Sequence, residues 1–573
     1  MDRQVPYVQN DAIELYMRTY YSLLRSSGEI LIRSLEESHM GSEASLHPRA
    51  STADLDVGAL GYAWARLPPA LLHTRKILLA QSLDVLAARG YAGVREWELA
   101  ESHARRRHAY FDGQGTLAAL IASVSDIDDM IPMITAYQIE WNKLHQRLRS
   151  SQVMTRVEEV LTRKRMPSAD LIGEIRMELG LDPEDMNRLQ GLWKGALWEN
   201  LRLICEEPKN LSVRLLAGSL SDYRKATQSW WRNITDTAGE ILKERPVYFV
   251  SSNTHVMPNL FSGYSRQARE ELLSFIEETR LERLDEEAEE ALQAESQGQP
   301  GRLENLLYYV LRARRRDPVV REAMEKWDSE SAFINVESSH GLDVDAQIFE
   351  LASLHPERFD SRLNMPGLEK LRKSRAVILN IDYPLGMAAY HLLSQVASGV
   401  DHLEAVYVMG KAATLNGRVG DVMIPNVVFD QHSQNTYLFR NALRGSDVAP
   451  WLGLGTVLDN QKAVTVRGTF LQNSSFMHVF YQEGYTDIEM ETGPYLSAVY
   501  EDAAPKRYPM DQIVNLFLLA PYELGFLHYA SDTPISRRQE LLSRSLSFFG
   551  MDSTYACAVA ILRRILQREI ERL

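Results

Sequence analysis

The chain changes its hydrophobic pattern near Arg245, and this change constrains the fold more than any other feature. From Asp11 to about Leu242 apolar residues recur at helical spacing, for example along 71–88. After Arg245, short apolar runs rich in β-branched and aromatic residues alternate with helical segments. A chain of 573 residues is also long for a single hydrophobic core. We therefore predict a large all-α domain over residues 1–242 and an α/β domain over residues 243–573.

The second domain is expected to contain a mixed, mainly parallel sheet flanked by helices. Strands that alternate with helices favour this architecture, with a binding site where the strands end. Residues from about 265 to 374 are charged and mostly helical in pattern, and we interpret them as a helical insertion. The expected strands are 246–251, 375–381, 404–409, 421–429, 463–467, 486–490 and 512–519.

The composition excludes several classes of partner. Lys and Arg number 63 against 77 Asp and Glu, which gives a formal charge of −14. A negative chain is a poor ligand for nucleic acid polymers or anionic membranes. Cys205 and Cys557 stand far apart, which indicates a reducing compartment without a disulfide framework. Because no apolar signal region or membrane-spanning run is present, we expect a cytoplasmic protein with no membrane partner.

Three short strings follow one another toward the C-terminus. Met409–Pro425 reads MGKAATLNGRVGDVMIP, Ile488–Gly493 reads IEMETG, and Ala530–Pro534 reads ASDTP. In this order and spacing they resemble the nucleoside phosphorylase and nucleosidase superfamily, over roughly the last 330 residues. The resemblance implies a nucleoside-phosphorylase-like α/β domain, assembly into homo-oligomers, and cleavage of the N-glycosidic bond of a purine nucleoside or nucleotide.

The resemblance implies that the IEMETG string holds a ribose. One carboxylate can accept hydrogen bonds from both cis hydroxyls of the sugar, which makes Glu491 the expected anchor. Met490 would supply an apolar wall under the sugar. Glu489 alternates to the other strand face and is the weaker candidate. The alternative interpretation of this string is an ordinary strand end with an N-capping Thr492.

The ASDTP string would face the base. A carboxyl group beside a purine can donate a proton to N7 of the leaving base, and the resemblance gives this role to Asp532, with Ser531 beside it. An aspartate at this position resembles the branch of the superfamily that accepts 6-aminopurines. Alternatively, Ser531 or Asp532 caps a following helix that runs through 536–541. We interpret the nearby His528 as structural.

The nucleophile side departs from the superfamily pattern. Phosphorylases of the superfamily carry an Arg two residues before the glycine of this turn, here Gly410, and a Ser or Thr after it. This chain has Val408 and Lys411 instead. A single ammonium cannot reproduce the bidentate guanidinium contact with phosphate, so we favour hydrolysis over phosphorolysis and keep phosphate as an alternative co-substrate. Gly386 lies in the turn before a helix predicted to begin near Met387, and this turn with the helix N-terminus can cradle an anion. Alternatively, the turn is a plain connection from strand to helix.

Asn253 and His255 follow the first predicted strand and are expected near the same place, where they would orient a water molecule or cap the next helix. The histidines form no HExxH or paired Cys/His spacing, so we predict neither a metal nor an organic cofactor. The alternative to an enzyme is a non-catalytic nucleoside or nucleotide sensor, or a scaffold that has lost the pocket.

Overall fold

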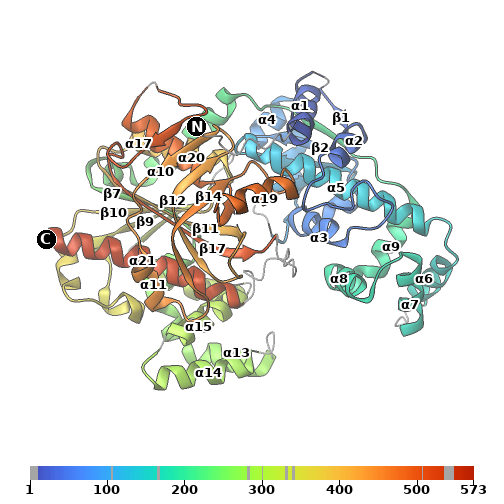
Figure 1. Ribbon diagram of the computed structural model, residues 1–573. Coiled ribbons are helices and arrows are strands. Elements are labelled where there is room, and N and C mark those ends of the chain that lie inside the picture. The colour runs from blue at the N-terminus through green and yellow to red at the C-terminus, as the bar shows by residue number, and fades with distance from the viewer. Residues whose placement is uncertain are drawn as a thin grey trace. The chain divides into compact units, whose positions relative to one another are not determined.

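The computed structural model describes residues 11–26, 28–104, 107–163, 168–279, 284–299, 301–315, 317–329, 333–338, 342–505, 507–534 and 548–573 (Figure 1). The chain divides into two compact units. The first contains residues 1–227 with the segments 340–343 and 466–479, and the second contains residues 228–339, 344–465 and 480–573. The boundary expected after residue 242 lies within the long helix that joins them, α10 (Leu220–Glu244).

The first unit is not all-α, so this part of the fold prediction is wrong. It contains a six-stranded sheet in the order β1-β6-β2-β5-β4-β3, in which β6, β2 and β5 are parallel. Its helices are α1 (Asp11–Ser26), α2 (Arg33–Gly41), α3 (Val57–Arg66), α4 (Leu83–Ala88), α5 (Val124–Leu148), α6 (Val153–Thr162), α7 (Ala169–Glu178), α8 (Pro183–Trp193) and α9 (Leu197–Glu206). Its strands are β1 (Ile30–Leu31), β2 (Lys76–Ala80), β3 (Glu98–Leu99), β4 (Ala109–Phe111), β5 (Thr116–Leu120) and β6 (Ser212–Leu215).

The error has a clear physical source in the segment 71–88. The central strand β2 is buried on both faces, so its sequence KILLA lacks the polar alternation of a half-exposed strand. Leu71, Leu72 and Leu83 lie on either side of it, separated from it by two or three polar residues, and a short continuous apolar run cannot be distinguished from a buried helix by periodicity. The segment contains a 3₁₀ turn, this strand and the short helix α4.

Helix α5, 25 residues long, is nearly all buried in the first unit. Ser123 caps its N-terminus by accepting from the amide of Ser125, and the carboxylate of Asp126 accepts from the amide of Ser123. This reciprocal pair satisfies amides that the first turn of a helix leaves without internal partners. The SVSD sequence therefore fixes where the helix begins.

The second unit is built on an eleven-stranded mixed sheet, with the main strand order β16-β13-β12-β14-β15-β11-β7-β10-β9-β8. Its strands are β7 (Val247–Ser251), β8 (Phe333–Val336), β9 (Ala346–Glu350), β10 (Val377–Ile381), β11 (Leu403–Thr414), β12 (Val422–Asp430), β13 (Asn435–Leu438), β14 (Val457–Thr465), β15 (Asp487–Glu489), β16 (Ile513–Asn515) and β17 (Glu523–Asp532). Its helices are α11 (Val256–Ser262), α12 (Tyr264–Gln267), α13 (Arg269–Thr279), α14 (Asp285–Ser296), α15 (Gly301–Arg314), α16 (Pro318–Ser329), α17 (Met387–Gly399), α18 (Gly445–Val448), α20 (Thr492–Ala503) and α21 (Phe549–Arg572), while α19 (Ser474–Gln482) continues into it from the first unit.

Strand β17 closes part of this sheet on itself. It pairs with β11 in parallel and with β12 in antiparallel register. Because β12 also pairs with β14, β14 with β15 and β15 with β11, these five strands form a closed ring. The ring brings strands that are far apart in the sequence to one point of the sheet.

The segment 265–374, expected to be a mostly helical insertion, also contains two strands of the sheet. Strand β9 pairs antiparallel with β10 and β8 with β9, so the segment extends the sheet at one edge. The expected strand over 512–519 also shrinks to the three residues of β16. Short strands inside charged helical sequence carry too few residues for a period of two to be recognised.

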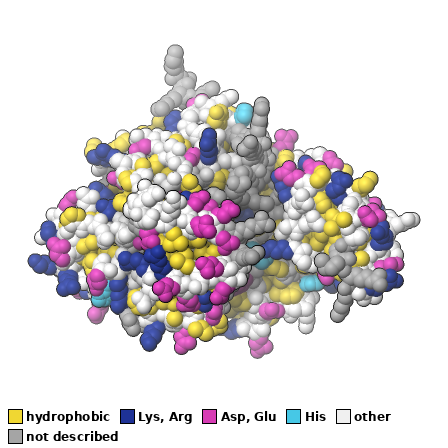
Figure 2. Space-filling model, turned by 90° about the horizontal axis from the view of Figure 1, so that it is seen from below, with side chains coloured by type: hydrophobic (Ala, Val, Ile, Leu, Met, Phe, Trp, Pro, Cys, Tyr) yellow, Lys and Arg dark blue, Asp and Glu magenta, His cyan; other side chains and the backbone are white. Residues whose placement is uncertain are grey.

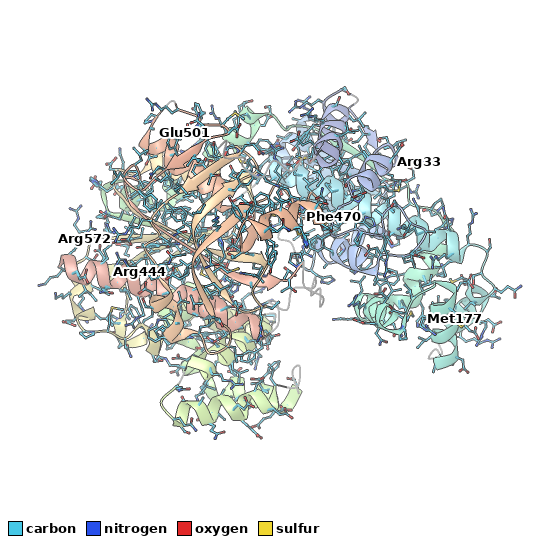
Figure 3. The ribbon with its side chains drawn as sticks, viewed as in Figure 1. Arg33, Met177, Arg444, Phe470, Glu501 and Arg572 are labelled. Atoms are coloured by element: carbon cyan, nitrogen blue, oxygen red, sulfur yellow. The ribbon has the colours of Figure 1, made fainter. Side chains whose placement is uncertain are left out.

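Helix α21 covers one face of the sheet, and helices α17 and α20 pack together on the other (Figure 1). Three arginines follow one another at four-residue spacing along α21 and so share one side of it. Arg564 and Arg568 pair with Glu523 at the start of β17, and Arg572, labelled in Figure 3, pairs with Glu404 in β11. The visible surface mixes acidic and basic side chains (Figure 2).

A buried polar cluster joins α15 to residues 360–362, which follow strand β9 in the sequence. Arg362 donates two hydrogen bonds to Asp360, at 2.9 and 2.8 Å, and Glu304 accepts from the hydroxyl of Ser361 at 3.0 Å. Burial, followed by the negative charge of Asp360, raises the pKa of Glu304 from its ordinary value of 4.5 to about 7. The folded protein therefore holds a proton on Glu304 that the unfolded chain loses above pH 4.5.

This cluster predicts that stability decreases as the pH rises from about 4.5 to about 7. Glu304→Gln, which mimics the protonated group, should match the wild type near pH 5 and exceed its unfolding free energy near pH 8 by on the order of 2–3 kcal/mol. Urea unfolding at the two pH values measures the difference, with Glu325→Gln on the exposed face of α16 as control. A constant offset at both pH values would contradict this titration.

Candidate functional site

A small cavity lies where several strands of the second unit end, and its volume is about 280 Å³ when the space open to solvent is included. Strands β7, β11, β15 and β17, the turn after β10 and the start of α20 all contribute to its wall. The lining residues are Ser251, Tyr383, Pro384, Val408, Met409, Gly410, Lys411, Glu489, Glu491, Thr492 and His528. Segments separated by up to 277 positions along the chain therefore meet at one site, at the kind of sheet edge where α/β proteins bind ligands.

The turn from β15 into α20 is fixed by Glu489. Its carboxylate accepts from the backbone amides of Glu491 and Thr492, both at 2.7 Å, and from the hydroxyl of Thr465. The carboxylate thereby satisfies the first amides of the helix, where the helix dipole also favours negative charge. Burial raises the pKa of Glu489 above its usual range, and the imidazole of His528 opposes this shift.

Glu491 lies at the N-cap of α20 and its side chain lines the cavity. One carboxylate oxygen accepts from the backbone amide of Gly386 at 3.1 Å, at the start of α17. Gly386 has φ +52° and ψ −120°, a conformation that side chains with a Cβ rarely adopt. The helix N-terminus that was predicted to bind an anion therefore binds the carboxylate of Glu491.

A hydrogen-bonded chain runs from the buried sheet to the cavity wall. Asp487 accepts from Nδ1 of His528 at 2.7 Å, and Nε2 of His528 lies 2.9 Å from Oγ1 of Thr492. All three side chains are buried. Burial alone would lower the pKa of His528, but Asp487, together with the more distant carboxylates of the site, raises it above 6.5.

The walls around these groups combine apolar and cationic side chains. Val408 and Met409 in β11 are buried, and Lys411 is exposed at the rim of the same strand. Tyr383 lines another wall, and its hydroxyl lies 3.1 Å from that of Tyr529. The cavity thus holds two carboxylates, one imidazole and one ammonium around an apolar floor, a set able to bind a polar ligand.

Several predicted site residues meet at this cavity and others do not. Glu491, Gly410 and Lys411 line it, and Gly386 contacts it through Glu491. Met490 is half-buried and is not among the lining residues.

The pairs Asn253/His255 and Ser531/Asp532 also lie outside the lining. Asn253 accepts from the amides of His255 and Val256 at the start of α11, which is the capping alternative. Ser531 donates to the carboxylate of Asp532 at 2.7 Å, at the end of β17. The helix that Asp532 was alternatively expected to cap, 536–541, lies outside the described residues.

Sequence reasoning underrated two residues of the cavity. His528 was interpreted as structural and Glu489 as the weaker carboxylate, yet both line the wall. Glu489 could have been found from its position just before the predicted N-capping Thr492, because an acidic side chain near a helix N-terminus can accept from the free amides of the first turn. Asp487, the partner of His528, lies 41 positions away in the sequence, and no local sequence pattern predicts such a pair.

Within the described ranges, no group of three or more His, Cys, Asp or Glu side chains is arranged to hold a metal ion. A search of the same residues finds no helix with the length and apolarity needed to cross a bilayer.

Comparison with known proteins gives a family but no activity. A family model described as "Family of unknown function (DUF6909)" matches residues 32–567. No curated protein matches the chain.

Among solved structures, the 5′-methylthioadenosine/S-adenosylhomocysteine nucleosidase of Neisseria meningitidis is 12% identical with a TM-score of 0.29, covering 43% of this chain and 95% of that one. The corresponding Campylobacter jejuni enzyme is 9% identical with a TM-score of 0.30, covering 56% and 99%. Uridine phosphorylase from Schistosoma mansoni is 9% identical with a TM-score of 0.29, covering 58% and 92%. Similarity at this level assigns no activity to the chain.

The site geometry predicts that Gly493 is required for the start of α20. A Cβ built on Gly493 would lie 2.6 Å from the side chain of Asp430, and the amide of Gly493 donates to Thr465 at 2.8 Å. Gly493→Ala should lower the unfolding free energy by about 1–3 kcal/mol through overpacking. Gly410→Ala is the control, because a Cβ there meets no atom within 4 Å. Equal thermal unfolding midpoints for the two variants would contradict this packing.

Proposed function

The chain belongs to DUF6909, a family of unknown function, and we propose that its second unit cleaves the N-glycosidic bond of a purine nucleoside or nucleotide by hydrolysis. The observation that carries the proposal is the carboxylate of Glu491, which lines the cavity and is held in place by the amide of Gly386. The order of the three sequence strings, which resembles the nucleoside phosphorylase and nucleosidase superfamily, supports the same conclusion.

The anchored carboxylate suits a ribose. A carboxylate has about four acceptor positions, so Glu491 can accept from both sugar hydroxyls while it keeps its bond to Gly386. Each charge-assisted hydrogen bond contributes about 1.5–3 kcal/mol. Because the amide of Gly386 restrains the carboxylate before the ligand arrives, little side-chain entropy is lost on binding.

The chemistry requires a nucleophile and a proton donor. The oxygen of water attacks C1′ of the ribose, the C1′–N9 bond breaks, and its electrons move onto the base. The base gains a proton from an acid, and the attacking water loses a proton to the solvent, so that the products are the sugar and the neutral base. Asp532 remains the proposed acid, and a purine whose ribose lies at Glu491 would have to extend along the paired ends of β11 and β17 to reach it.

Two observations support water over phosphate as the nucleophile. The amide of Gly386, at the N-cap of α17, could have bound phosphate but donates to Glu491. Val408 is buried where the resemblance would place an arginine, and among the described residues of the lining Lys411 alone is a Lys or Arg. We therefore propose that base release proceeds without added phosphate and yields ribose, or ribose phosphate from a nucleotide.

A second candidate is a nucleoside or nucleotide sensor that binds without cleavage. It is favoured by one observation, which is that Asp532 does not line the cavity. Incubation with adenosine and AMP in phosphate-free buffer separates the two, because an enzyme releases adenine whereas a sensor gives only saturable binding. The proposed homo-oligomer and the cytoplasmic location stay predictions for either function.

Glu491→Ala should weaken adenosine binding by several kcal/mol, with a much smaller loss for free adenine, because only the riboside uses the carboxylate. Titration calorimetry with both ligands measures the contrast. Glu483→Ala, at an exposed turn of the same unit, should change neither affinity. Equal losses for riboside and free base would remove Glu491 from the sugar site.

Asp532→Asn keeps the shape of the side chain but removes the proton supply. Adenine release from adenosine should therefore fall by roughly 10²- to 10⁴-fold with little change in affinity. Single-turnover assays separate the chemical step from binding. An unchanged rate would show that Asp532 only terminates β17.

A further inference from the structure

In the hydrogen-bonded series Asp487–His528–Thr492, the donor and the acceptor of the buried hydrogen bond between Asp487 and His528 are known. A carboxylate can only accept, so Nδ1 of His528 carries the hydrogen that it donates to Asp487, whether the ring is neutral or charged. The remaining nitrogen, Nε2, faces Oγ1 of Thr492. Its protonation decides which of the two atoms donates in that contact.

The charged groups around His528 favour the imidazolium. Asp487 and Glu489 face it from β15 and Glu491 faces it from the start of α20, and all three carry negative charge when ionised. Lys411, on the paired strand β11, contributes the opposing positive charge at the cavity rim. Three carboxylates against one exposed ammonium leave a net negative environment, in agreement with the raised pKa of the ring.

We propose that a charged His528 donates to Thr492 and thereby turns the hydroxyl hydrogen of Thr492 into the cavity, where it donates to an oxygen acceptor of the ligand. Within the described part of the chain, the contact with His528 is the only hydrogen bond to this hydroxyl. A hydroxyl that accepts from an imidazolium keeps its own hydrogen for another acceptor. Thr492 lines the cavity, so a bound ligand is in position to supply that acceptor.

Deprotonation of His528 would reverse this polarity. A neutral Nε2 accepts, so the hydroxyl of Thr492 would turn its hydrogen toward the ring and present only lone pairs to the ligand. Thr492 is thus a specificity-determining residue, and Asp487 and His528 position it. The choice of ligand rests on the proposed function, whereas the direction of the hydrogen bond between His528 and Thr492 does not.

The first test needs no ligand. In protein labelled with ¹⁵N-histidine, long-range ¹H–¹⁵N spectra report the charge of each ring, and His528→Gln identifies the signal of His528. We expect both nitrogens of His528 to carry hydrogen at low pH, with a titration midpoint above the ordinary value of 6.5. Thr492→Val removes the acceptor and should lower the titration midpoint of His528, and Asp487→Asn should lower it by about 1–3 pH units.

A titration midpoint below 6.5 in the wild type would overturn the proposal, because it would show that the site disfavours the charged ring. So would a higher midpoint in Thr492→Val, because it would show that the threonine donates to the ring. If Asp487→Asn fails to fold, the nearly isosteric Thr492→Val still decides the direction.

The second test measures adenosine affinity against pH. The wild type and Thr492→Ser should bind less tightly as the pH rises through the midpoint of His528. Thr492→Val should bind about 3- to 10-fold more weakly at low pH, with a flat profile in this range. A pH dependence retained in Thr492→Val would overturn the ligand contact. Failure of every variant to bind adenosine would contradict the proposed function, while the imidazole spectra would still decide the state of His528.

Discussion

The carboxylate of Glu489 is the interaction on which the site depends. It is buried at the end of β15 and accepts from the amides of Glu491 and Thr492 and from the hydroxyl of Thr465. A buried carboxylate without such donors would be costly, and helix amides without an acceptor would be costly too, so each group removes the penalty of the other. The turn that results presents Glu491 and Thr492 to the cavity from consecutive positions.

The closed ring of strands brings these residues to their partners. Strand β17 reaches β11 and β12 from a distant part of the sequence and carries His528 to the wall beside Thr492. The amide of Gly386, at the start of α17 on another βα unit, reaches Glu491. Two hydrogen bonds between distant segments therefore fix the positions of the residues that line the cavity. The backbone conformation at Gly386 and the close contact of Gly493 with Asp430 both require glycine.

Patterns of neighbouring residues predicted the ends of strands and the starts of helices, which depend mainly on those neighbouring residues. The runs that form β7 and β10 end at polar or turn residues, and α17 begins at the Met387 that the pattern indicated. The central strand β2 was missed because its short apolar sequence lacks the polar alternation of a half-exposed strand. The chain that joins Asp487 to His528 was missed because it depends on strand pairing, which one sequence does not reveal.

The central claim is that Glu491 accepts hydrogen bonds from the sugar hydroxyls. It is tested most directly by the affinities of adenosine, 2′-deoxyadenosine and 3′-deoxyadenosine for the wild type and for Glu491→Gln. The account predicts that loss of either hydroxyl costs the wild type about 1.5–3 kcal/mol and costs Glu491→Gln much less, a coupling that a double-mutant cycle reports. Equal losses in the two proteins would show that the hydroxyls do not bind Glu491 and would contradict the account.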